Sequence, residues 1–155
     1  MTVKPIPEGY TGISPYLTVD DGKRAIEFYK QAFGATERGR MAAPDGRIAH
    51  AELQIGDAVL MLCDSFPQFV TQTPTEVGGT TVGMFLYVED VDAVVQQAAA
   101  AGATVTREPE DQFWGDRLGV ITDPYGHVWH IATRVEELAP EEIVARSREV
   151  FASMA

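Results

Sequence analysis

The sequence predicts an α+β fold in which two βαβββ modules form curved mixed sheets around a trough, with a C-terminal helix after them. Two observations lead to this prediction. Patterns typical of a strand, a helix and three further strands occur over residues 12–64 and again over residues 82–134. Landmarks in the two halves also recur at nearly constant spacing, pairing Val19 with Val88, Gly34 with Gly102, and Gly56 with Gly126. A sheet with one helix on its back needs its other face covered, and pairing two modules covers it while leaving a trough.

Residues 1–134 are therefore expected to form one paired domain, with residues 1–11 as a loose leading arm. In the first module a strand is expected over 13–19, and Asp20 or Asp21 caps a helix that ends at Gly34. Short strands follow at 36–41 and 58–63. Between them, residues 48–55 alternate, which places His50, Glu52 and Gln54 on the face opposite Ala49, Ala51, Leu53 and Ile55.

Residues 64–81 show no clear period and are expected to form a loop between the modules, with a mobile flap as the alternative. The simpler expectation for Phe66 and Phe69 is that they pack on the surface. In the second module, strands are expected over 82–88, 103–107, 120–122 and 128–132, with a hairpin region over 108–119. Asp90 caps its helix and Gly102 ends it. Residues 135–155 form a C-terminal helical extension that begins at Pro140 and covers a sheet edge or a partner subunit.

Composition limits the classes of partner. The formal net charge is -11, which argues against nucleic acid and anionic membrane surfaces as partners. A single cysteine, Cys63, excludes an internal disulfide and suits a reducing cytoplasm. No stretch is long and apolar enough to cross a membrane. We therefore expect a cytoplasmic protein whose partners are a small-molecule ligand and a second copy of the chain, in a homodimer.

The order of elements, with the turn Asp123-Pro124-Tyr125-Gly126-His127 before the last strand, resembles the vicinal oxygen chelate superfamily. That superfamily includes glyoxalase I, extradiol dioxygenases, fosfomycin-resistance enzymes and bleomycin-binding proteins. The resemblance covers about residues 12–134. Three segments are similar to the PhnB-type branch: His50-Ala51-Glu52-Leu53, Trp114-Gly115-Asp116-Arg117 and Trp129-His130-Ile131-Ala132-Thr133. Because this fold hosts several chemistries, the resemblance implies a fold more strongly than a reaction.

In metal-using members of the superfamily, each module supplies one ligand from its first strand and one from its last. Carried over to this sequence, the resemblance places Ser14, Met61, Gly83 and His130 at those positions. Glycine has no side chain, a thioether suits soft metals, and a protonated serine is a poor ligand, so only His130 remains. A relocated site is the alternative, since His50 and Glu52 lie at i and i+2 on one strand and could join His130.

These patterns leave more than one function open. The first is a metal-free, cofactor-free protein that binds a small molecule through His50, Glu52, Met61, Trp114 and His130. The second is an enzyme of the same superfamily, of isomerase, lyase or dioxygenase type, that uses His50, Glu52 and His130 with a relocated metal or as acid–base groups. A purely structural or regulatory module is the third, if large side chains such as Met61, Trp114 and Phe85 fill the trough. For Asp116 and Arg117, adjacent on a strand, we expect opposite directions and a solvated or turn-stabilising role.

Overall fold

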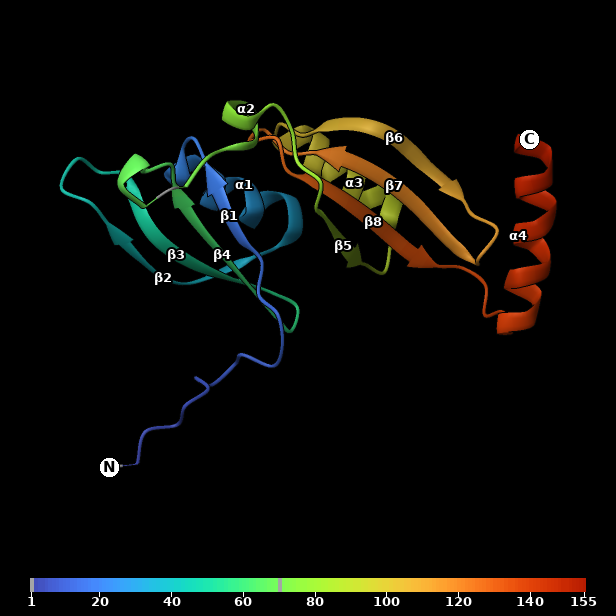
Figure 1. Ribbon diagram of the computed structural model, residues 1–155, viewed down its shortest axis with the longest axis horizontal. Helices are drawn as coiled ribbons and strands as arrows, with labels where there is room; N and C mark the ends of the chain where they lie inside the picture. Colours follow the sequence, from blue (N-terminus) through green and yellow to red (C-terminus); the bar gives the residue numbers. More distant parts are fainter. Residues whose placement is uncertain (1, 70) are drawn as a thin grey trace. The chain divides into compact units, whose positions relative to one another are not determined.

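The computed structural model describes residues 2–69 and 71–155 (Figure 1). Met1, in the expected arm, and Val70, in the expected loop, lie outside the described residues. The chain divides into two compact units. The first unit comprises residues 1–80 with 124–126, and the second comprises 81–123 with 127–155. Each unit holds one four-stranded mixed sheet, so the α+β prediction with two mixed sheets and a C-terminal helix is confirmed.

The first unit follows the expected order of strand, helix and three strands. Its elements are β1 (Tyr16–Val19), α1 (Gly22–Phe33), β2 (Thr36–Ala42), β3 (Ile48–Ile55) and β4 (Ala58–Asp64). The sheet order is β1-β4-β3-β2, with β1 parallel to β4 and the other neighbours antiparallel. A short 3-10 helix, Pro67–Phe69, and α2 (Pro74–Val77) complete the unit.

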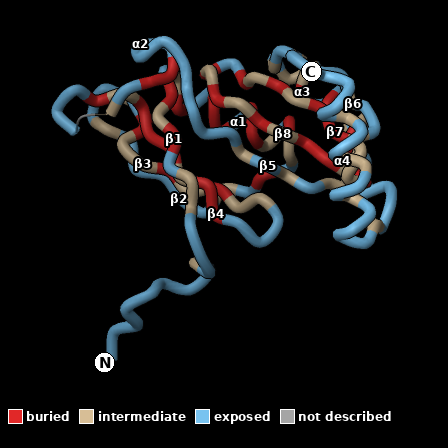
Figure 2. Tube along the Cα trace, turned by 45° about the vertical axis from the view of Figure 1, so that its right-hand side comes forward, coloured by how far each residue is buried: buried red, intermediate tan, exposed pale blue. Residues whose placement is uncertain are grey.

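The second unit repeats this arrangement. Its elements are β5 (Gly83–Tyr87), α3 (Val91–Ala101), β6 (Thr104–Asp111), β7 (Asp116–Thr122), β8 (Val128–Arg134) and α4 (Pro140–Met154). The sheet order is β5-β8-β7-β6, and β5 is parallel to β8. In Figure 2 the buried segments run along the strands and helices of each unit, whereas α4 and the leading arm are largely exposed.

Local chemistry explains where α1 begins and ends. The Asp21 carboxylate accepts a hydrogen bond from the backbone N–H of Arg24 at 3.2 Å, so Asp21 is the cap that the sequence leaves open between two residues. Gly34 ends the helix at φ 67°, a conformation that costs glycine little. The buried Asp64 carboxylate accepts from the N–H groups of Gly22, at 2.9 Å, and Ile48, at 2.6 Å. Asp64 therefore ties the start of α1 to two strands.

In each unit the helix covers one face of the sheet, and we call the opposite face the helix-free face. Against α1 lie the buried side chains Leu17, Val19, Ala51, Leu53 and Leu62. Against α3 lie Ile121, Trp129 and Ile131. Strand alternation then turns the intervening residues to the helix-free face. The hydrophobic core of each unit thus fixes which side chains remain available for a ligand.

Several expected strand boundaries are wrong. The first strand begins at Tyr16 rather than at residue 13, because Pro15 lacks an N–H and takes part in pairing only through its carbonyl, which accepts from Met61 N at 2.9 Å. The strand expected over 103–107 continues to Asp111, and its partner begins at Asp116. Register irregularities between Val105 and Glu110 break the alternation that would have revealed it.

The segment expected to be a structureless loop contains short helices. The side chain of Thr73 accepts from Glu76 N, and the Glu76 carboxylate accepts from Thr73 N, which together form a capping box at the start of α2. Phe66 is buried rather than packed on the surface, with the guanidinium of Arg47 4.1 Å from its ring centroid. Phe69 is exposed, as expected. A four-residue helix is too short to show a hydrophobic period, so only the capping motif could have indicated it.

The C-terminal helix α4 begins at Pro140, as expected, and none of its residues is buried. Arg146 bonds the Glu136 carboxylate with both terminal nitrogens at 3.1 Å, and Phe151 packs edge-on against Phe113. These contacts place α4 beside the turn that joins β6 and β7 (Figure 1). Among residues 2–69 and 71–155, no helix combines the length and apolar character that a membrane span requires.

Candidate functional site

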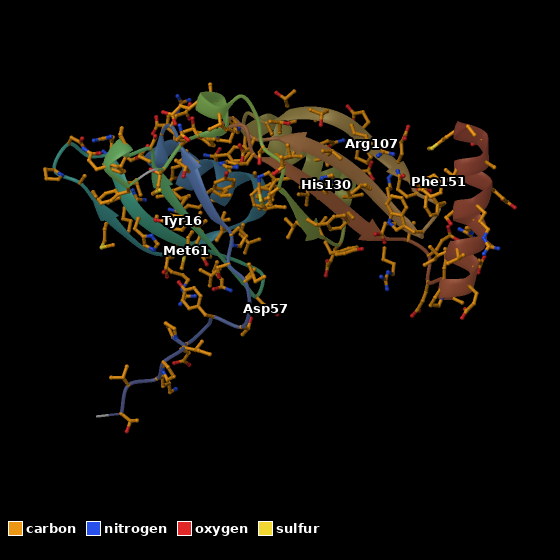
Figure 3. The ribbon with its side chains drawn as sticks, viewed as in Figure 1. Tyr16, Asp57, Met61, Arg107, His130 and Phe151 are labelled. Carbon is orange, nitrogen blue, oxygen red and sulfur yellow. The ribbon has the colours of Figure 1, made fainter. Side chains whose placement is uncertain are left out.

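The helix-free face of the first unit carries a line of polar and aromatic side chains from three adjacent strands. Pairing aligns Tyr16 of β1 with Met61 of β4, and Met61 with Glu52 of β3. His50 lies two residues before Glu52 and shares its face. Figure 3 marks Tyr16 and Met61 on this sheet. The predicted residues His50, Glu52 and Met61 therefore belong to one surface, and Tyr16 joins them.

A hydrogen-bonded chain connects these groups. The Tyr16 hydroxyl lies 3.0 Å from His50 Nδ1, and His50 Nε2 lies 3.4 Å from Glu52 Oε1. The Tyr16 and His50 rings also stack, with centroids 5.4 Å apart. Glu52 accepts a further hydrogen bond from the Tyr10 hydroxyl, which is the main cause of the lowered pKa of its carboxyl group. Arg38 Nε lies 3.9 Å from Glu52 Oε2.

This chain determines the tautomer of His50. Ionised Glu52 can only accept, so His50 Nε2 must carry the hydrogen that it donates. In the neutral imidazole, Nδ1 then carries the lone pair and accepts from the Tyr16 hydroxyl. Burial raises the pKa of Tyr16 to about 12, with Cys63 as a further cause, so the phenol keeps its proton near neutrality. Both nitrogens of His50 are thus engaged within the protein.

We expect Tyr16 to titrate well apart from an exposed tyrosine. A folded-state pKa of about 12 lies above the ordinary value of 10, so the protonated phenol stabilises the fold at pH below 10, and this contribution is lost as pH rises through 12. The tyrosinate absorbance of the Tyr16→Phe variant, subtracted from that of the wild type, should show a single step near pH 12. A step near pH 10 would contradict this, and Tyr16→Phe should also lose less stability between pH 10 and 12.

In the second unit, His130 lies on the helix-free face of β8 (Figure 3). It pairs with Phe85 of β5, and the two rings stack almost in parallel, with centroids 5.9 Å apart. Phe85 in turn contacts Tyr87, and both are about half exposed. A Cβ atom at Gly83 would come within 2.9 Å of the His130 ring. The imidazole therefore occupies the space that a side chain at position 83 would need.

Asp116 anchors the aromatic side chains near His130. Its carboxylate accepts from the Tyr87 hydroxyl at 2.7 Å and from Trp114 Nε1 at 3.0 Å, and Arg134 Nε lies 4.0 Å away. Asp116 is 1% exposed, so the expected solvated role is wrong, whereas the hydrogen bond from Trp114, in the turn between β6 and β7, agrees with the turn-stabilising alternative. Trp114, a predicted ligand-binding residue, is half-buried. Its ring lies edge-on to Phe113, and its Nε1–H is bonded to Asp116.

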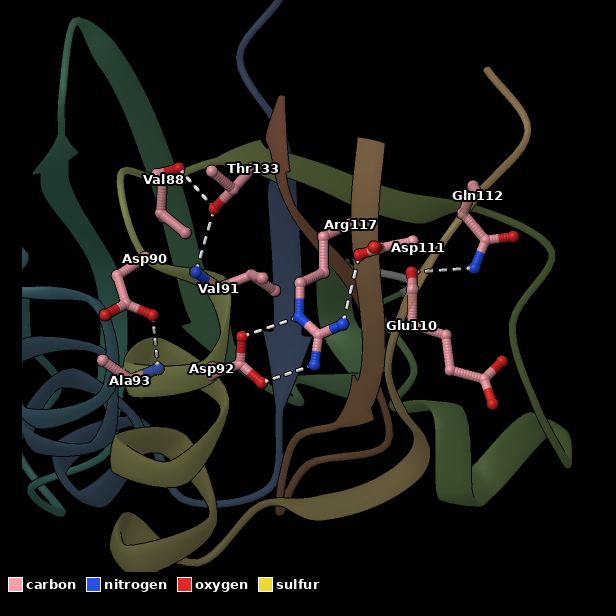
Figure 4. Close-up of polar contacts among 10 residues, drawn as sticks. All are labelled: Val88, Asp90, Val91, Asp92, Ala93, Glu110, Asp111, Gln112, Arg117 and Thr133. Atoms are coloured by element: carbon pink, nitrogen blue, oxygen red, sulfur yellow. Dashed lines mark hydrogen bonds and ion pairs between the residues drawn. The ribbon is translucent and has the colours of Figure 1, made fainter. Parts of the chain in front are cut away.

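Arg117 points to the opposite face, as expected from its adjacency to Asp116. Its guanidinium donates to both oxygens of Asp92 on α3, at 2.8 and 3.0 Å, and to Asp111 at 3.1 Å (Figure 4). In the same view, Thr133 accepts from Val91 N and donates to the Val88 carbonyl. These contacts join α3 to the sheet and leave the helix-free face to His130 and its neighbours.

The donor atoms in each unit can be compared with the metal ligands that the superfamily resemblance implies. In the first unit these positions hold Ser14, just before β1, and Met61. In the second unit they hold Gly83 and His130. This set supplies one imidazole, one thioether, one hydroxyl and no carboxylate, which does not fit a divalent ion that prefers oxygen and nitrogen donors. Within residues 2–69 and 71–155, no group of three or more His, Cys, Asp or Glu side chains could hold a metal ion.

Two βαβββ units with side chains gathered on the helix-free faces of their sheets define a protein of the vicinal oxygen chelate type. The model of the Glyoxalase/Bleomycin resistance protein/Dioxygenase superfamily matches residues 11–131, and the chain belongs to that superfamily. A relative from Mycobacterium bovis, an uncharacterised protein, is 49% identical over 136 residues, which cover 86% of this chain and 90% of the relative.

Solved structures are similar in fold. TioX from Micromonospora sp. ML1 aligns with a TM-score of 0.65 and 27% identity, over 81% of this chain and 99% of TioX. An Arabidopsis thaliana gene product aligns with a TM-score of 0.63 and 29% identity, over 79% of this chain and 98% of that structure.

Sequence reasoning missed Tyr10, Tyr16 and Arg38 as site residues; it named Phe85 only as a side chain that could fill the trough, and Asp116 only in a solvated or turn-stabilising role. Tyr16 and Phe85 share a strand face with predicted residues through pairing between strands, and single-strand alternation does not reveal which residues pair. Tyr10 and Arg38 reach Glu52 from distant parts of the chain. One sequence signal was available. A strand face that carries a histidine and a glutamate needs hydrogen-bond partners, and tyrosines and arginines elsewhere in the same module are candidates.

Proposed function

We propose that this chain is a small-molecule-binding protein of the glyoxalase/bleomycin-resistance type that binds its ligand without a metal ion. The chemistry of the donor set carries the proposal: the four superfamily ligand positions provide only one imidazole, and both nitrogens of His50 are already hydrogen-bonded. The helix-free faces meanwhile present aromatic rings and polar groups, which is the usual lining of a ligand site. We place the ligand-binding role on His50, Glu52, Met61, Trp114 and His130.

The proposal includes the finer assignments that the sequence suggests. We place the protein in the PhnB-type branch, on the three quoted segments around His50, Trp114 and His130. We also propose a homodimer, because exposed aromatic side chains such as Phe85 and Tyr87 on a helix-free face favour coverage by another surface. The single buried thiol of Cys63 suits the cytoplasm.

One observation favours a second function, acid–base catalysis. The chain from Tyr16 through His50 to Glu52 joins a phenol, an imidazole and a carboxylate in series. A ligand placed beside Glu52 can give its proton to this carboxylate and take it back at another atom, while His50 and Tyr16 hold the carboxylate in place, as an isomerase or lyase reaction requires. Loss of turnover but not of ligand binding in His50→Gln would support this second function.

Elemental analysis combined with a thermal-shift screen tests the metal-free proposal. Protein purified without added metal should contain no stoichiometric divalent ion, and treatment with EDTA should leave its Tm and its affinity for ligand unchanged. A ligand from a small-molecule library, at one hundred times its Kd, should stabilise the fold by about 2.7 kcal/mol. One ion per chain, or ligand binding that EDTA abolishes, would contradict the proposal.

A further inference from the structure

The leading arm docks on the helix-free face of the first unit through a short turn, residues 7–10. Tyr10 N bonds the Pro7 carbonyl at 3.3 Å, and the Tyr10 hydroxyl donates to Glu52 Oε1. Arg38 holds the same turn from the sheet: Nη2 donates to the Glu8 carbonyl at 3.2 Å, and the guanidinium carbon lies 5.2 Å from the Tyr10 ring centroid. Glu52 therefore binds the Tyr10 hydroxyl, and the Arg38 guanidinium contacts the Tyr10 ring.

Glycine permits this close approach. Gly9 adopts φ +87°, and a Cβ atom there would lie 2.9 Å from Arg38 Nη1. The hydrogen bond between the phenol and the carboxylate also shifts the pKa values of the two groups in opposite directions. Their hydrogen bond is the main cause of the raised pKa of Tyr10 and of the lowered pKa of Glu52. The contact thus pairs a neutral hydroxyl donor with an ionised acceptor.

The attachment is local. Residues 2–6 are exposed and form no helix or strand, so the turn is held mainly by the contacts of Tyr10 and Arg38. Contacts of this kind at a partly exposed surface are individually weak. A tethered group of this kind competes with free ligand as if it were present at millimolar concentration. A ligand with the same chemistry and further contacts on the face can therefore displace it.

We propose that Tyr10 is a resident occupant of a phenol-binding subsite, and that the ligand of this face carries a phenolic hydroxyl which replaces that of Tyr10 on Glu52. This inference rests on the proposed function, because it places the ligand on the surface that holds His50 and Glu52. Glu52 accepts the hydroxyl hydrogen, and Arg38 faces the aromatic ring. An aromatic compound without a hydroxyl lacks the group that Glu52 recognises.

Titration with p-cresol, which reproduces the tyrosine side chain, tests this inference on the full chain. The readout is the backbone amide NMR shifts of His50, Glu52 and Met61. Tyr10→Ala vacates the subsite, so p-cresol should bind this variant about tenfold more tightly than the wild type. p-Xylene, with a methyl group in place of the hydroxyl, should bind neither protein measurably. Ile6→Ala, a change at an exposed residue of the same arm, should behave as the wild type.

Adding Glu52→Gln to Tyr10→Ala should abolish most of the gain, because the amide is a weaker acceptor than a carboxylate. Equal affinity of wild type and Tyr10→Ala, absence of p-cresol binding to both, or affinity that Glu52→Gln leaves unchanged would each overturn the inference. A library ligand whose affinity is unchanged by Tyr10→Ala would leave the proposed function intact but contradict the phenol-binding subsite. Stoichiometric metal in the purified protein would instead remove the proposed function and leave the p-cresol result standing.

Discussion

Replacing Gly22 with alanine is expected to lower the free energy of unfolding by about 3 kcal/mol. A Cβ atom at this position would lie 2.6 Å from Ile48 Cβ and 2.7 Å from Asp64 Oδ2. Both neighbours are buried, and Asp64 is held by its hydrogen bonds to Gly22 N and Ile48 N. The added methyl group must therefore move the start of α1 or break those bonds. Urea denaturation followed by circular dichroism measures the change.

Gly39→Ala is the matched control, because a Cβ atom at Gly39 meets no atom within 4 Å. This substitution in β2 should change the free energy of unfolding by no more than about 0.5 kcal/mol. Equal effects of the two substitutions would show that the junction of Asp64, Gly22 and Ile48 does not hold α1 on its sheet.

His130→Ala is expected to weaken ligand binding about tenfold, using a ligand found in the thermal-shift screen. The imidazole lies on the helix-free face and stacks on Phe85, so its removal deletes one ring of that aromatic surface. His127→Ala should affect affinity less, because His127 is a buried residue of the turn before β8 and its N–H bonds Asp123. Isothermal titration of the folded variants provides the comparison.

Gly83→Ala refines this test. Its methyl group would meet the His130 ring at 2.9 Å, and the ring can turn away because it ends a side chain. We expect an affinity between those of the wild type and His130→Ala, with stability nearly unchanged. If His127→Ala and His130→Ala weaken binding equally, His130 is not a ligand-contacting residue, and its placement in the site is wrong.

Local sequence signals predicted the parts of the fold that depend on local chemistry. Asp90 and Gly102 bound α3, as their types suggest, and the alternation of residues 48–55 placed His50 and Glu52 on one face. The duplication of the modules followed from recurring landmarks rather than from identity of side chains. The caps and the alternation involve residues only a few positions apart, where propensity and period suffice, and the duplication needs only a comparison of such local patterns along the chain.

The rest of the candidate site depends on contacts between distant segments. Tyr10 and Glu52 are 42 positions apart, and Tyr87 and Asp116 are 29 apart. No periodicity within one strand shows that the tyrosine of β5 donates a hydrogen bond to an aspartate two strands away. The predicted boundaries of β6 were wrong for a related reason, because its bulged register is set by pairing with β7.

His130 lies so close to Gly83 that its present rotamer leaves no room for a side chain at position 83. A chelating side chain grafted at position 83 would collide with the imidazole that should become its fellow ligand. Engineering a cation centre in the second unit therefore requires a new rotamer for His130 and, with it, loss of the stack on Phe85. A single substitution at position 83 would therefore weaken the aromatic surface without yet creating a complete cation site.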